Sequence, residues 1–148
     1  MGFLFLMLLA FVAGTALSIQ AGVNSSLGSE SGKAVWATLA SFVIGAIFLL
    51  PFTFVPRLDW PTMQQLGAVR WWAWTGGLIG AAYVLSTILL APRLGATVFF
   101  GIVIAGQILM AIILDHYGLI GFQRHPVNAM RIAGAALIIA GVFVVHRF

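Results

Sequence analysis

The sequence contains no cysteine and very little charge. Of its 148 residues, 7% are charged and 62% are hydrophobic. Without cysteine, neither a disulfide framework nor a thiolate metal site can form. Soluble domains typically carry about 25% charged residues. So few charges cannot cover a water-exposed surface, and most of the surface is therefore expected to face lipid.

Enzyme motifs are missing as well. The sequence has no glycine-rich phosphate loop, no HExxH motif, no nucleophile elbow and no acidic residue in the middle of an apolar run. We therefore expect no catalytic residue, no metal site and no cofactor, and a membrane enzyme is the least favoured class. The net charge of +4 would suggest nucleic acid in a soluble protein. Here it is expected to reflect arginines at lipid headgroups, so no nucleic-acid partner is predicted.

Alternating apolar and polar segments, the pattern of a membrane β-barrel, are absent too. Continuous apolar runs near the ~20 residues of a spanning helix take their place. An all-α integral membrane protein is predicted, a small polytopic bundle that forms one transmembrane domain over residues 1–148. The first run could be mistaken for a signal peptide, but it lacks a positive n-region and further runs follow it. The expected spans are 3–23, 34–55, 71–91, 96–114 and 127–145.

The segments between these runs carry turn and interface signals. Residues 24–33 are polar and contain glycine, which is typical of a loop. Pro51 should break the second run near its end. Residues 60–70 are expected to form a short interfacial helix, with Asp59 near its start and Pro61 in its first turn.

Polar residues lie at the end of the fourth run and at the start of the fifth. Asn128 is placed to cap the fifth helix, and Arg131 to reach back to the interface. For Asp115 and His116, a capping or arginine-paired role is favoured over proton transfer, because both lie beside a loop.

The lysines and arginines are almost evenly divided between the two sides. Five spans place the termini on opposite sides, with Lys33, Arg93 and Arg147 on one side and Arg57, Arg70, Arg124 and Arg131 on the other. The positive-inside rule then gives little preference for either orientation. One interpretation is that the few charges near the amino terminus still decide the orientation. The other is that the chain inserts both ways and pairs as an antiparallel homodimer.

Polar side chains inside the apolar runs are the best functional signal, because they are costly in hydrocarbon. Gln20 and Asn24 share a helix face, and Tyr83 and Gln107 lie within the third and fourth runs. These residues either bond between helices or line a cavity that binds a small-molecule substrate.

Tryptophans and glycines at the third run have packing alternatives. Trp71 and Trp72 are candidate aromatic contacts to a substrate, although a headgroup belt explains them at least as well. Gly76 and Gly80 form a GxxxG pair that suits close helix packing.

Several segments, in order and spacing, resemble the YdcZ-like family of the drug/metabolite transporter (DMT) superfamily. They are 20–27, 41–42 with Gly45, 71–81, 92–96, 106–107, 115–118 and 131–134. The resemblance covers essentially the whole chain. It implies a multi-pass protein of the bacterial inner membrane with about five helices, whose single-domain forms resemble dual-topology dimers. It implies no particular substrate.

The favoured function is therefore that of a secondary transporter of a small organic solute, formed by an antiparallel dimer. In such transporters the substrate site lies near the midplane at the repeat interface. A passive channel built from the same dimer and a non-transporting partner subunit remain the alternatives. Substrate, coupling ion, direction of transport and orientation of the amino terminus do not follow from the sequence.

Overall fold

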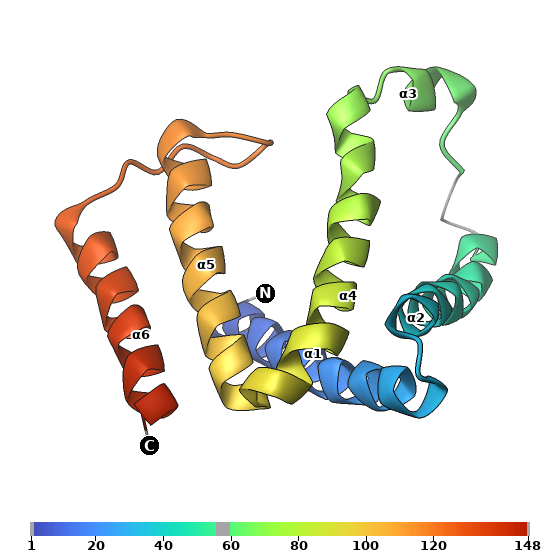
Figure 1. Ribbon diagram of the computed structural model, residues 1–148. Helices are drawn as coiled ribbons and strands as arrows, with labels where there is room; N and C mark the ends of the chain where they lie inside the picture. The colour runs from blue at the N-terminus through green and yellow to red at the C-terminus, as the bar shows by residue number, and fades with distance from the viewer. Residues whose placement is uncertain (1, 56–59, 148) are drawn as a thin grey trace. The chain divides into compact units, whose positions relative to one another are not determined.

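The computed structural model describes residues 2–55 and 60–147, and within these residues every regular element is helical (Figure 1). Five helical segments are long and apolar enough to cross a membrane, which confirms the expected number. The elements are α1 (Phe3–Ser31), α2 (Ala34–Leu49), η1 (Leu50–Phe54), α3 (Met63–Gly67), η2 (Trp71–Thr75), α4 (Gly76–Leu94), α5 (Ala96–Tyr117) and α6 (Ala129–Arg147).

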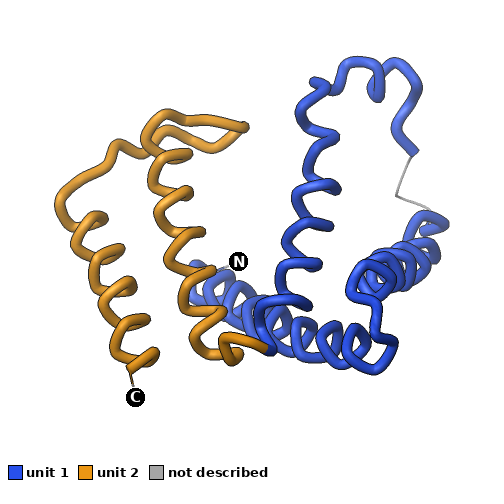
Figure 2. Tube along the Cα trace, in the orientation of Figure 1, with its two compact units in different colours: residues 1–92 blue, residues 93–148 orange. Residues whose placement is uncertain are grey.

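The chain divides into two compact units, residues 1–92 and 93–148 (Figure 2). The first unit holds α1, α2, α3 and most of α4, and the second holds α5 and α6. The expectation of one membrane domain over residues 1–148 stays a prediction. The two units are described separately below.

Helix α1 is longer than expected, and the loop predicted at residues 24–33 is wrong for most of its length. The helix continues to Ser31 and ends at Gly32, whose φ of 67° is left-handed. Two of the serines that suggested a loop are accommodated because their hydroxyls donate to carbonyls of the same helix. Ser29 donates to Ser26 (2.9 Å) and Ser31 to Leu27 (2.6 Å).

The connection after α2 agrees with the expectation at Pro51 and departs from it at the interfacial helix. Pro51 does break the α-helix, which passes into the 3-10 helix η1 after Leu49. The interfacial helix is shorter than predicted, because α3 covers only Met63–Gly67. Its start is set by a capping box between Thr62 and Gln65, so Pro61 precedes the helix and does not lie in its first turn. Asp59 lies outside the described residues.

The remaining helices each run about three residues beyond the predicted ends of their spans. Helix α4 includes Pro92 and continues to Leu94, where Gly95 with φ 81° separates it from α5. Helix α5 continues to Tyr117 and ends at Gly118, with φ 64°. In both places a left-handed glycine, and not the nearby proline or charge, ends the helix.

In the first unit, glycines allow the helices to approach one another. A Cβ added to Gly28 on α1 would lie 2.5 Å from Cγ2 of Ile88 on α4, so only glycine fits there. A Cβ added to Gly80 of α4 would lie 3.6 Å from Cζ of Phe42 on α2, which is an ordinary contact distance. Gly76 faces open space. The predicted GxxxG pair therefore does not make a close backbone contact within this unit, and Gly28 makes the tight one.

In the second unit, α5 and α6 pack as a hairpin. Gly101 of α5 lies under the side chain of Val142 on α6, and an added Cβ would be 3.0 Å from it. At the loop end, Asn128 caps α6 as expected, accepting a hydrogen bond from the Arg131 amide (2.9 Å).

Several polar residues tie the α5–α6 loop to the helix ends. Nη1 of Arg131 pairs with Asp115 at 3.2 Å, which confirms the arginine-paired role favoured for that aspartate. The Arg131 guanidinium also donates to the carbonyl of His125 (3.3 Å). Nδ1 of His116 accepts from the backbone amide of Val127 (3.1 Å). These contacts satisfy groups that the helix ends would otherwise leave unpaired.

Gly28 offers a direct test of the α1–α4 contact. Replacing Gly28 with alanine should destabilise the protein by about 1–3 kcal/mol, because the new methyl group must displace the branched side chain of Ile88. The measurement is thermal unfolding of the purified protein in detergent.

Gly22→Ala is the matched control, because Gly22 lies on the same helix and an added Cβ there meets no atom within 4 Å. That variant should be neutral or slightly more stable, since alanine favours a helix over glycine. Equal stability of the two variants would show that α1 and α4 do not pack through Gly28.

Candidate functional site

The spanning segments turn their apolar side chains outward. In each of the five spanning segments, at most 11% of the residues of the apolar stretch are buried within the chain. Most hydroxyl groups in these segments bond to carbonyls of their own helix, as Thr38 does to Ala34 (3.0 Å) and Ser86 to Ala82 (2.7 Å). Such groups need no further partner in hydrocarbon. The polar side chains that lack this solution are therefore the candidates for a site.

Three of the six predicted site residues surround one crevice in the first unit. Gln20 and Asn24 of α1 and Tyr83 of α4 line it together. They are brought together because positions three and four apart on α1 share the face that packs against α4. Thr87, one turn after Tyr83, completes the polar lining, and the remaining lining residues are Leu17, Ala21 and Val84.

Asn24 is the most constrained of these polar groups. It is 6% exposed, and its amide makes no side-chain hydrogen bond to any residue in the described parts of the chain. The hydroxyl of Thr87, by contrast, donates to the carbonyl of Tyr83 (2.9 Å). Beside Asn24, the hydroxyl oxygen of Ser25 is buried and has no partner among the described residues. Among the side-chain atoms of the described residues, only this hydroxyl oxygen is both fully buried and unpartnered, so the Asn24 amide is reachable from the crevice that it lines. Its donors and acceptor are therefore free to bond to a polar group that enters the crevice.

The crevice is narrow in this structure. Its free volume, about 10 Å³ for the centre of a water molecule, corresponds to one bound water. A solute enters only if α1 and α4 separate or if another copy of the chain adds to the lining. Tyr83 and Gln20 lie at its partly exposed edge, where such a change would begin.

The predicted tryptophans lie away from the crevice. Trp71 and Trp72 begin η2, and Tyr83 follows Trp71 by 12 residues, which corresponds to roughly 18 Å along a helix axis. Trp71 is 80% exposed. Both positions suit a headgroup belt. A substrate contact for these two residues stays a prediction.

Gln107 belongs to the second unit and does not line the α1–α4 crevice. Its side chain is exposed on α5. At about 100° per residue, it lies on the face of α5 opposite Val98 and Ile102, which line a groove toward α6. The amide is therefore without a partner in the hairpin, and its role in substrate binding stays a prediction.

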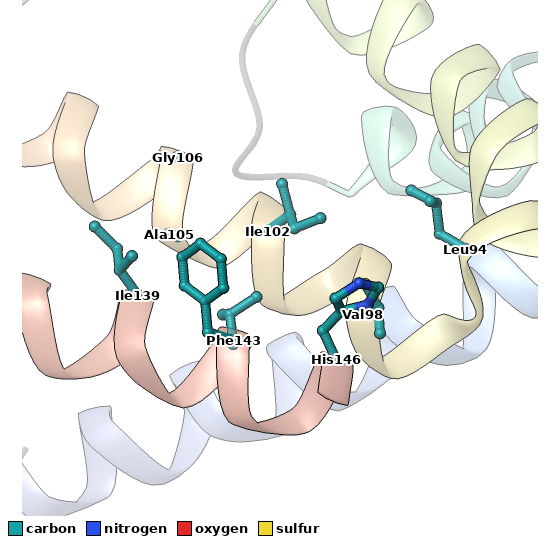
Figure 3. Close-up of a pocket in the computed structure, with 9 residues that line it drawn as sticks. Leu94, Val98, Ile102, Ala105, Gly106, Ile139, Phe143 and His146 are labelled. Atoms are coloured by element: carbon teal, nitrogen blue, oxygen red, sulfur yellow. The ribbon is translucent and has the colours of Figure 1, made fainter. Parts of the chain in front are cut away.

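A groove between α5 and α6 was not predicted. It has a volume of about 460 Å³ and lies at the end of the hairpin away from the loop (Figure 3). Its lining is apolar except for His146, and it includes Val98, Ile102, Gly106, Ile139 and Phe143. The sequence signal was the small-residue step Gly101, Ala105 and Gly106 on α5, which leaves space beside a neighbouring helix.

Five apolar helices that turn their side chains outward define a multi-pass helical membrane protein. The model of the family described as "Putative inner membrane exporter, YdcZ" matches residues 5–144. The chain therefore belongs to this family, within the drug/metabolite transporter superfamily, and the predicted resemblance is confirmed.

A curated relative agrees with this assignment. The chain is 26% identical over 145 residues to "Inner membrane protein YdcZ" of Escherichia coli (strain K12), and the match covers 94% of both chains. The predicted location, the bacterial inner membrane with several crossings, is confirmed. No solved structure matches the chain.

Cysteine labelling tests whether the amides face water. The native chain has no cysteine, so single substitutions report without background. Gln20→Cys and Gln107→Cys should react with a small membrane-impermeant thiol reagent in intact membranes, because lipid exposure of the native amides would be too costly. Leu109→Cys, on another exposed face of α5, should remain unlabelled. Protection of both glutamine positions at the level of Leu109 would identify the amides as packing residues.

Proposed function

We propose that the protein is a secondary transporter of a small organic solute and works as an antiparallel homodimer of dual topology. Family membership supports an exporter of the inner membrane. The observation that carries the proposal further is the crevice between α1 and α4, where buried Asn24 lacks a partner beside Gln20 and Tyr83. Polar side chains within spanning helices that are not paired with one another mark substrate pathways in many membrane proteins.

The chemistry of the crevice indicates the class of solute. Two carboxamides and a phenol provide several donors and acceptors, and no carboxylate, lysine or arginine lines the space. A neutral or weakly charged solute with hydrogen-bonding groups matches such a lining. A strongly charged one would lack a counter-charge and would pay for its own desolvation.

The dimer is supported by the even charge distribution and by the odd number of spans. Arg131 lies at the loop end of α6, close to Arg124, so four lysines and arginines belong to one side and three to the other. A difference of one gives little orientation preference. Two copies in opposite orientations would supply the inverted pair on which many alternating-access transporters are built, with the site at their interface.

Transport is tested in two steps. Thermal-shift screening of the purified protein against neutral and singly charged metabolites identifies a ligand, since a solute at 100 times its Kd stabilises by about 2.7 kcal/mol. The solute is then assayed in proteoliposomes. Accumulation against its gradient is expected, and Gln20→Leu and Asn24→Leu should reduce it at least tenfold while the fold remains intact.

Other outcomes distinguish the alternatives. Flux that only dissipates a gradient would indicate a passive channel built from the same dimer. A protein that carries no solute, and whose leucine variants gain stability without any change in flux, would be a non-transporting partner subunit.

Dual topology is tested by labelling from each side of the membrane. Cysteines placed singly at Ser29 and at Gln123, both exposed beyond the apolar runs, should each be labelled from both sides in a population of inserted chains. Adding three lysines beside Gln123 should lock one orientation and lower transport, because like-oriented copies cannot pair as inverted repeats. If each cysteine, in a chain without the added lysines, were labelled from a single side at high yield, the antiparallel homodimer would be contradicted.

A further inference from the structure

The groove between α5 and α6 has the form of a site for a hydrocarbon chain. Its volume is about 460 Å³, and Val98, Ile102, Ile139 and Phe143 line it without any hydrogen-bonding group along its length. A polar solute would lose its water there and gain no hydrogen bond. An apolar chain loses no hydrogen bond on entering the groove, and it makes van der Waals contacts that an empty groove would lack.

One end of the groove is basic. His146 stands beside Val98 and Leu94 at this end, whereas Ile139 and Gly106 lie at the other (Figure 3). Arg147 lines an adjoining hollow of about 450 Å³ together with Phe143, Val144 and His146. Arg93 directly precedes the lining residue Leu94. Two arginines and a histidine therefore belong to the end of the hairpin at which the apolar groove opens.

No acidic side chain of this unit balances that end. Residues 93–148 contain one acidic side chain, that of Asp115, which pairs with Arg131 at the opposite end of α5. Asp115 follows Ala96 by 19 residues, or roughly 28 Å of helix. Because α6 ends at Arg147 after an apolar span, this basic end belongs at the height of the lipid headgroups.

We propose that this groove binds one anionic phospholipid, with an acyl chain along α5 and α6 and the phosphate at Arg93, His146 and Arg147. The charge supplies the preference for an anionic headgroup, and the groove supplies the attraction for the chain. The site is separate from the α1–α4 crevice and does not depend on transport activity.

Lipid binding by the full-length protein in detergent tests the site. Native mass spectrometry is run with phosphatidylglycerol and with phosphatidylcholine of the same acyl chains. The wild type should retain one phosphatidylglycerol with a clear preference, about fivefold for each arginine near the headgroup. Equal retention of the two lipids would overturn the proposal.

Two variants distinguish the contribution of the lipid headgroup to binding from that of the acyl chain. Arg93→Gln combined with Arg147→Gln should abolish the preference and leave phosphatidylcholine binding unchanged. Gly106→Leu should weaken binding of both lipids at least tenfold, because a Cβ at Gly106 meets no atom within 4 Å and the side chain would enter the groove. Unchanged phosphatidylglycerol binding in either variant would contradict the site.

The matched controls are Arg70→Gln, in the first unit, and Gly141→Leu. Gly141 is likewise open, but lies on the face of α6 away from Ile139 and Phe143. Both controls should bind as the wild type does.

Photolabelling of the unmodified chain makes the test independent of variant folding. A phosphatidylglycerol with a photoreactive group in mid-chain should attach to peptides 96–106 and 139–146. Adducts confined to the first unit would overturn the proposal.

Discussion

Every polar group within the hydrocarbon layer needs a partner, and this constraint determines most of what the structure shows. Helices satisfy the backbone groups, and short hydroxyl side chains bond back to carbonyls of their own turn, as Thr15 does to Val12 and Thr87 to Tyr83. Asn24, Gln20 and Gln107 find no such solution among the described residues. These amides are therefore the polar groups most available to a polar solute.

The same constraint explains how much of the fold could be predicted. Spans follow from uninterrupted apolar runs, so their number and approximate positions were accessible from the sequence. The ends of the helices were harder to predict from the sequence, because several local signals compete there. The serines after Asn24 suggested a loop, yet in the structure the hydroxyls of Ser29 and Ser31 bond within α1, and Gly32 with positive φ ends the helix.

The sequence predicts which candidate residues share a face of one helix, but it does not predict which faces of two helices meet. Gln20 and Asn24 share a face at a spacing of four, which the sequence shows directly. Their meeting with Tyr83 depends on which glycine lets two helices approach closely. The sequence offers 17 glycines, and the pair at Gly76 and Gly80 predicts a close helix contact there, whereas in the structure Gly28 makes the tight contact with Ile88. A periodic motif indicates that a close approach is possible, but the partner helix decides where it occurs.

The two units handle polar groups in opposite ways. In the α5–α6 hairpin, Asp115 and Arg131 satisfy each other beside the loop, and the groove at the far end is apolar up to His146. Between α1 and α4, the buried amide of Asn24 is left uncommitted. A paired charge at a membrane edge stabilises one arrangement of the hairpin, whereas an uncommitted buried amide favours any arrangement that gives it a partner. Residues that bind a transported solute need the second property, because they must exchange partners as the solute arrives and leaves.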